Sequence, residues 1–101
     1  YVTDNVAVFI LPDQAWARRV SGVFSNNLAN QYPDRAHAVV TYTSANDYQV
    51  SVRAPLNNKV KADELCASFA TGGGRRAAAG INHLPPTGLT EFIAKLSQTY
   101  P

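Results

Sequence analysis

Cysteine is nearly absent from this sequence of 101 residues: Cys66 is the only one, so the chain cannot form an internal disulfide. No apolar run reaches the roughly 18 residues of a transmembrane helix. Residues 1–4 also lack the basic and apolar regions that begin a signal peptide. We therefore expect no membrane partner, and a reducing, cytoplasmic location.

Residues that bind metals are also scarce. The chain has two histidines, His37 and His83, and neither lies in an Asp-His-His segment; its seven acidic residues are scattered. A two-metal hydrolase needs several carboxylate and imidazole ligands around its metal pair. We therefore expect no catalytic residue, no metal site and no cofactor in this chain, and no enzyme activity from it alone.

Charge of either sign is modest. Nine lysines and arginines stand against seven aspartates and glutamates, and a net charge of +2 does not by itself indicate a polyanionic partner. Six of the nine basic residues are arginines, which can grip phosphate or carboxylate with two parallel hydrogen bonds. The apolar fraction of 46% excludes a disordered chain, and the length suits one domain.

Hydrophobic patterning predicts strands that alternate with helices. Continuous or alternating apolar residues predict strands at residues 6–11, 37–43, 48–54 and 81–84, the middle two forming a hairpin. Helical spacing predicts a helix capped by Asp13, a short one at 62–70, a helical turn at 75–79 and a last helix capped by Thr87. We expect a single α/β (α+β) domain with one mixed β-sheet and helices packed on it.

The first of these helices has an apolar stripe that includes Trp16 and Phe24, which we expect to be core residues. In the strand at 48–54, Ser51 and Arg53 share one face, and a plain solvent-facing strand would have the same pattern. Cys66 lies on the apolar face of its helix, which favours a buried, unreactive thiol.

Three adjacent glycines, Gly72, Gly73 and Gly74, are followed by Arg75 and Arg76. Glycines let the backbone approach a ligand closely, and successive N–H groups can form an anion-binding hollow. A helical turn that begins at Arg75 would add its free N–H groups and its dipole. The segment is therefore either a phosphate cradle or a flexible helix cap followed by a solvated arginine pair.

Residues 72–80 read GGGRRAAAG and resemble the GGGHxxAAG signature of the DHH-associated domain, first subfamily, of the DHH phosphoesterase superfamily. The resemblance covers nearly the whole chain, including the opening β-α-β pattern and the strand that carries Arg53. Arg75 stands where the family has a histidine. The resemblance therefore indicates the fold but not which end group of the substrate is bound. Alanyl-tRNA synthetases carry a related glycine-rich domain, often with arginine after the glycines; the closing Ala-Ala-Gly looks more like the phosphoesterase branch.

The resemblance implies that residues 1–101 are a C-terminal substrate-binding domain, with a manganese-dependent catalytic DHH domain expected upstream. It implies binding of single-stranded nucleic acid, a short oligonucleotide or a nucleotide phosphate, in a parent that is an exonuclease, an oligoribonuclease or an exopolyphosphatase-related hydrolase. The implied substrate-binding residues are Ser51, Arg53, Gly72, Gly73, Gly74, Arg75 and Arg76. The alternative is an interdomain scaffold or dimerisation domain that contacts no ligand.

Overall fold

A mixed five-stranded sheet forms the centre of the computed structural model, which describes residues 1–43 and 46–101. Its strand order is β1-β2-β3-β5-β4. The parallel pair is β1 with β2, and the pairs β2–β3, β3–β5 and β4–β5 are antiparallel. The strands are β1 (Val6–Ile10), β2 (Ala36–Tyr42), β3 (Tyr48–Arg53), β4 (Gly72–Gly74) and β5 (Ala78–Leu84). This mixed sheet confirms the predicted fold class and the predicted hairpin.

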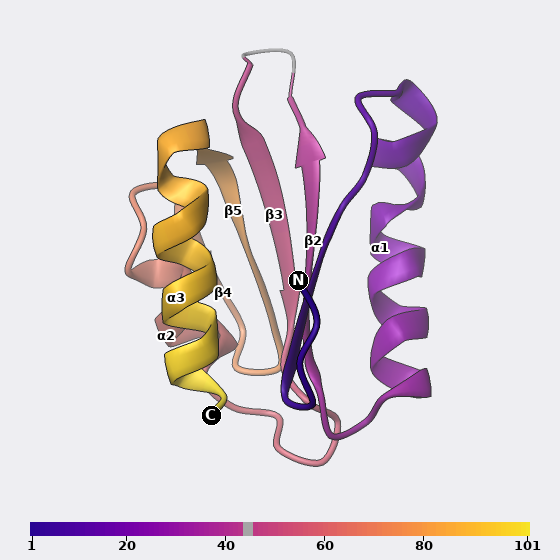
Figure 1. The fold of residues 1–101 in the computed structure, drawn as a ribbon, viewed down its shortest axis with the longest axis vertical. Helices are drawn as coiled ribbons and strands as arrows, with labels where there is room; N and C mark the ends of the chain where they lie inside the picture. Colours follow the sequence, from indigo (N-terminus) through magenta and orange to yellow (C-terminus); the bar gives the residue numbers. More distant parts are fainter. Residues whose placement is uncertain (44–45) are drawn as a thin grey trace.

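Helices cover the two faces of the sheet unequally. The long helix α1 (Ala15–Gln31) stands alone on one face, over β2 and β3 (Figure 1). On the other face lie α2 (Ala62–Ala67) and α3 (Leu89–Thr99), the latter preceded by the 3-10 turn η1 (Pro86–Gly88). Within the described part of the chain, no helix is long and apolar enough to cross a membrane.

The main core lies between the sheet and the pair α2 and α3. Strand β3 sends Val50 and Val52 into it, and Phe92 and Leu96 of α3 pack there fully buried. The alternate residues of β3 point to the α1 face, as the sequence predicts, because successive side chains of a strand point to opposite sides. The sheet therefore has one apolar face and one face that carries polar groups.

The prediction that Trp16 of helix α1 is a core residue is wrong. Trp16 is 48% exposed, and Val20 and Val23 of the same stripe are 42% and 65% exposed. Leu28 of the stripe is buried as predicted, and Phe24 is half-buried, with its ring 5.7 Å from that of Phe9. The small residues Ala17, Ser25 and Ala29 complete the buried face of the helix. Small residues let the helix lie close to the strands, and the buried Ser25 hydroxyl is satisfied by donating to the Ser21 carbonyl at 2.7 Å.

The segment after α2 also differs from expectation. The three glycines form the edge strand β4, and β5 begins at Ala78, so the predicted helical turn at 75–79 is wrong. Pairing with a neighbouring strand has overridden the helix propensity of the alanines. The cap positions of α1 and α3 are Gln14 and Gly88 instead of Asp13 and Thr87.

Truncation of Phe92, a core aromatic residue, should destabilise the chain much more than truncation of Trp16, which lies at the surface. Phe92→Ala should lower the free energy of unfolding by about 3–5 kcal/mol, because it leaves a cavity in the main core. Trp16→Ala should cost less than about 1 kcal/mol, as for most surface changes. Urea unfolding followed by circular dichroism measures both, and equal losses would contradict the outward placement of Trp16.

Candidate functional site

A hollow of about 440 Å³ lies on the α1 face of the sheet, where β3 ends and β5 begins. We call it the basic hollow, because Arg53, Lys59 and Arg75 line it and no carboxylate does. Its remaining lining comes from α1, from the loop after β3 and from the β4–β5 connection: Asn26, Ala29, Asn30, Ala54, Leu56, Ala77 and Ala78.

Arg53 is held in a defined orientation in this hollow. Its Nε donates to Asn26 Oδ1 of α1 at 3.1 Å, and its Nη1 donates to Ser51 Oγ at 2.9 Å and to the Val52 carbonyl at 3.2 Å. All these partners are neutral, so they fix the guanidinium without cancelling its charge. An arginine oriented in this way has already lost much of the side-chain entropy that binding an anion costs.

The guanidinium groups of Arg53 and Arg75 repel each other here. Partial burial, followed by the nearby charge of Arg75, lowers the pKa of Arg53 from its ordinary value. The group still stays protonated at neutral pH, because an arginine cannot be deprotonated in practice. Across residues 1–43 and 46–101, no carboxylate pairs with either arginine or with Lys59. The hollow therefore holds unneutralised positive charge.

A second hollow, of about 330 Å³, adjoins the first along β3. We call it the neutral hollow, because no charged side chain lines it. Its residues come from α1 and from strands β2, β3 and β5: Ser21, Val39, Thr41, Gln49, Val50, Ser51, Gly80, Ile81 and Asn82. Ser51 links the two hollows, since it lines this one and accepts the hydrogen bond from Arg53 of the other.

The three adjacent glycines have different structural roles. A Cβ on Gly72 would lie 1.7 Å from the backbone oxygen of Cys66, so close packing of α2 requires a glycine there. Gly74 has a φ of +142°, and its Cβ would lie 2.5 Å from Ala79 Cα. A Cβ on Gly73 would meet nothing within 4 Å. Packing therefore explains two of the glycines and leaves Gly73 unexplained.

Gly73 lies on the same face of the sheet as Arg53. It pairs with Gly80 of β5, and Gly80 pairs with Ser51 of β3. Residues directly opposite each other in antiparallel strands point to the same side. The row from Ser51 through Gly80 to Gly73 therefore carries one small side chain and two glycines, and of the two glycines only Gly73 faces open space.

The structure brings together some of the predicted site residues and not others. Arg53 and Arg75 share the basic hollow, Ser51 joins it to the neutral hollow, and Gly73 faces the same side. Arg76 lines neither hollow; its carbonyl accepts from the Ala62 N–H at 3.1 Å. The helix N-terminus expected at Arg75 does not exist, because Arg75 lies in the connection from β4 to β5. Gly72, Gly73 and Gly74 of β4 line neither hollow, so the positive groups of the basic hollow are side chains and not a glycine cradle.

Sequence patterns missed Asn26 and Lys59. Each is an ordinary polar residue in a segment far along the chain from the glycines, and only the packing of α1 and the loop after β3 brings it to Arg53. No local signal could have found them. The substrate-binding roles assigned to the residues above remain predictions.

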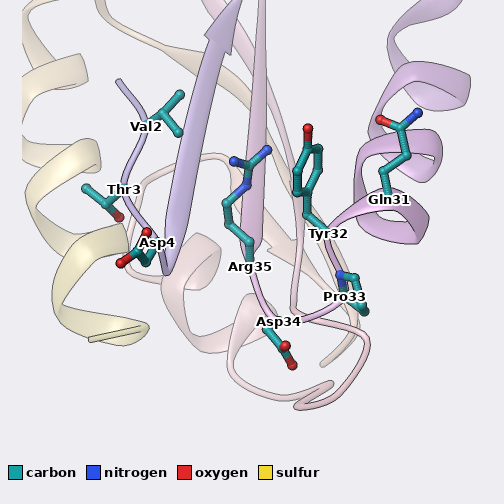
Figure 2. Close-up of a pocket in the computed structure, with 8 residues that line it drawn as sticks. All are labelled: Val2, Thr3, Asp4, Gln31, Tyr32, Pro33, Asp34 and Arg35. Carbon is teal, nitrogen blue, oxygen red and sulfur yellow. The ribbon is translucent and has the colours of Figure 1, made fainter.

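A larger hollow, of about 500 Å³, lies at the C-terminal end of α1, between residues 2–4 and residues 31–35 (Figure 2). Figure 2 shows the Arg35 guanidinium facing the Tyr32 ring, 3.9 Å from its centroid. Arg35 also donates through Nε to His37 Nε2, and burial together with this cation lowers the pKa of His37 to about 4. Asp4 and Asp34 line the same hollow and would repel a phosphate. The basic hollow is therefore the better anion site.

Metal and thiol chemistry find no support in the part of the chain that the structure describes. No group of three or more histidine, cysteine, aspartate or glutamate residues there could hold a metal ion. Cys66 is fully buried, and burial, followed by the charge of Asp63, raises its pKa to about 12. This confirms the prediction of a buried thiol, since the reactive thiolate is disfavoured.

Comparison with known proteins gives a family and a fold. The model of the DHHA1 domain family matches residues 3–100. Among solved structures, the C-Ala domain of alanyl-tRNA synthetase from Aquifex aeolicus superposes with a TM-score of 0.65 and 16% identity. The match covers 95% of this chain and 88% of that one, and at this identity it shows a shared fold. No curated protein sequence matches the chain.

Alanine substitutions at Gly72 and Gly73 should have different effects on stability, because only Gly72 is closely packed. Gly72→Ala should lower the free energy of unfolding by about 1–3 kcal/mol or more, because the new methyl group collides with the α2 backbone. Gly73→Ala should change it by less than about 0.5 kcal/mol. Urea unfolding of the two variants checks this, and a loss at Gly73 as large as that at Gly72 would show that the face is not open.

Proposed function

The chain belongs to the DHHA1 domain family, and from this premise we propose that it binds the phosphate end of a single-stranded nucleic acid or nucleotide. In this proposal the basic hollow holds the phosphate, and the chain positions the substrate for a separate catalytic DHH domain. That domain, in the same parent protein, would bind the manganese ions and hydrolyse the phosphoester bond. The 101-residue chain alone would not hydrolyse the substrate. The shared fold with a domain of a synthetase that is named for tRNA is consistent with a nucleic-acid ligand.

One observation carries the proposal: Arg53 and Arg75 face one hollow without a carboxylate to neutralise them. Two guanidinium groups brought together in a partly buried place raise each other's energy. A bound phosphate removes that repulsion and accepts charge-assisted hydrogen bonds from both. A hollow that only packed against an uncharged protein segment would gain nothing from holding these two charges together.

Arg53 and Ser51 form the centre of this phosphate site. The Ser51 hydroxyl accepts from Arg53, so its own hydrogen is free to donate to a phosphate oxygen beside the guanidinium. Asn26 holds the Nε side of Arg53, which leaves Nη2 without a partner among the described residues. Lys59 adds a further cation at the same hollow.

A contact with a partner domain is a second candidate function, and the exposed apolar stripe of α1 favours it. Trp16, Val20 and Val23 lie at helical spacing on the outer side of that helix. An apolar stripe of this kind is typical of a surface covered by another protein segment. The two functions are compatible, because the stripe and the basic hollow use different residues.

Removal of the Arg53 side chain should discriminate between ligands with and without a terminal phosphate. Arg53→Ala should weaken binding of a 5′-phosphorylated oligonucleotide roughly tenfold or more, the effect of losing a charged hydrogen bond of about 1.5–3 kcal/mol. Binding of the unphosphorylated oligonucleotide should change little. The slope of log affinity against log salt should also become shallower by about 0.7 for the phosphorylated single strand. Fluorescence titrations at two salt concentrations measure all three quantities.

Two further variants serve as controls for Arg53. Lys95→Ala removes a cation from α3 on the opposite face and should leave both affinities unchanged. Arg53→Lys keeps the charge without the planar fork and should fall between wild type and Arg53→Ala. An equal loss for both oligonucleotides in Arg53→Ala would mean that this arginine contributes general charge or structure.

A carboxylate placed at Gly73 should abolish binding without unfolding the chain. Gly73→Asp has room for its side chain on the open face, where it adds a negative charge beside the phosphate site. Circular dichroism should be native, while the affinity for the 5′-phosphorylated oligonucleotide is lost. Gly73→Asn, which has the same shape without the charge, should retain most of the affinity. A native Gly73→Asp variant with unchanged affinity would move the phosphate away from β4.

A further inference from the structure

We propose that the neutral hollow is a base-binding subsite, in which the side-chain amides of Gln49 and Asn82 bind the hydrogen-bonding edge of one nucleobase. This inference rests on the proposed function, since it needs a nucleic acid whose phosphate lies in the basic hollow. It adds the prediction that the chain distinguishes a nucleotide with a base from one without.

Charge separates the two hollows. Cations line the basic hollow, whereas only hydroxyl, amide, apolar and backbone groups line the neutral one. A second phosphate would find no cation in the neutral hollow. A nucleobase is uncharged and carries donors and acceptors on its edge, so its chemistry fits this lining.

The two amides are available for a ligand. Gln49 and Asn82 are both exposed, and the side chain of neither makes a hydrogen bond with the described part of the chain. Each amide offers two donors and an acceptor, which is the arrangement that reads a base edge through two hydrogen bonds. In contrast, other polar groups of the hollow are engaged: the Thr41 hydroxyl donates to the Gln49 carbonyl, and Ser51 accepts from Arg53.

A β-bulge between β3 and β5 brings the side chains of Gln49 and Asn82 close to each other. The register of β3 against β5 shifts between Tyr48 and Val50, so Gln49 lies at the bulge next to the segment that holds Asn82. Bulges often redirect a side chain beside a binding site. Gly80, which precedes this segment on β5, lines the hollow without a side chain, and a Cβ there would lie 2.8 Å from the Val50 carbonyl oxygen.

The spacing along β3 suits one ligand that occupies both hollows. Gln49 and Arg53 are four residues apart, about 13 Å along a strand. Arg53 reaches back toward Ser51, which shortens the gap that the ligand must span. A nucleotide whose 5′-phosphate lies at Arg53 can therefore place its own base, or that of the next nucleotide, between Gln49 and Asn82.

The test uses 5′-phosphorylated DNA tetramers and the 101-residue chain. One tetramer carries abasic sites at its first two positions, and four others carry adenine, cytosine, guanine or thymine there; all end in two thymidines. For wild type, we expect the preferred base to bind about tenfold more tightly than the abasic tetramer, as two net hydrogen bonds would produce. Gln49→Ala and Asn82→Ala should each reduce this difference to about threefold, the double variant should abolish it, and all three should bind the abasic tetramer as wild type does.

A matched control is Gln98→Ala, which removes an exposed amide from α3 on the opposite face and should change nothing. The inference is overturned if wild type binds the abasic tetramer as tightly as all four others. It is also overturned if Gln49→Ala and Asn82→Ala weaken the abasic and base-bearing tetramers equally. If one of these two results is found while Arg53→Ala still weakens binding of the tetramers, the base subsite is wrong but the phosphate site is supported. Failure of wild type to bind any tetramer contradicts the phosphate site and this subsite together.

Discussion

The alternation of side chains along β3 is the constraint on which the fold and the site both depend. Val50 and Val52 point into the core beneath α2 and α3, and this burial fixes the register of the strand. The same register places Gln49, Ser51 and Arg53 on the α1 face. A slip of one residue would bury the arginine and expose the valines, so core packing also holds the arginine in place.

Sequence patterns predicted the fold class, the hairpin of β2 and β3, the buried Cys66 and the shared face of Ser51 and Arg53, because each depends on local periodicity. They were wrong about Trp16, since periodicity identifies an apolar stripe but not the surface that it faces. They were also wrong about residues 75–79, where pairing with β4 overrides alanine's preference for helix. Asn26 and Lys59 could not be predicted, because only tertiary packing brings them to Arg53.

The glycine motif combines two kinds of constraint in three residues. Gly72 and Gly74 are needed by the backbone packing of α2 and β5, whereas nothing in the fold requires Gly73 to lack a side chain. Arg75, which directly follows these glycines, lines the same hollow as Arg53. An arginine at this place offers a planar fork that can bind a phosphate through two parallel hydrogen bonds.

The most direct test of the phosphate site is an NMR titration of the ¹⁵N-labelled chain with a 5′-phosphorylated dinucleotide. The account predicts that the Arg53 side-chain Nε–H and the backbone amides of Ser51, Gly73 and Gly80 shift together with one affinity. Signals from α3, on the far face of the sheet, should stay in place. Saturable shifts confined to α3, or to the outer stripe of α1, with Arg53 and Gly73 unmoved, would contradict it.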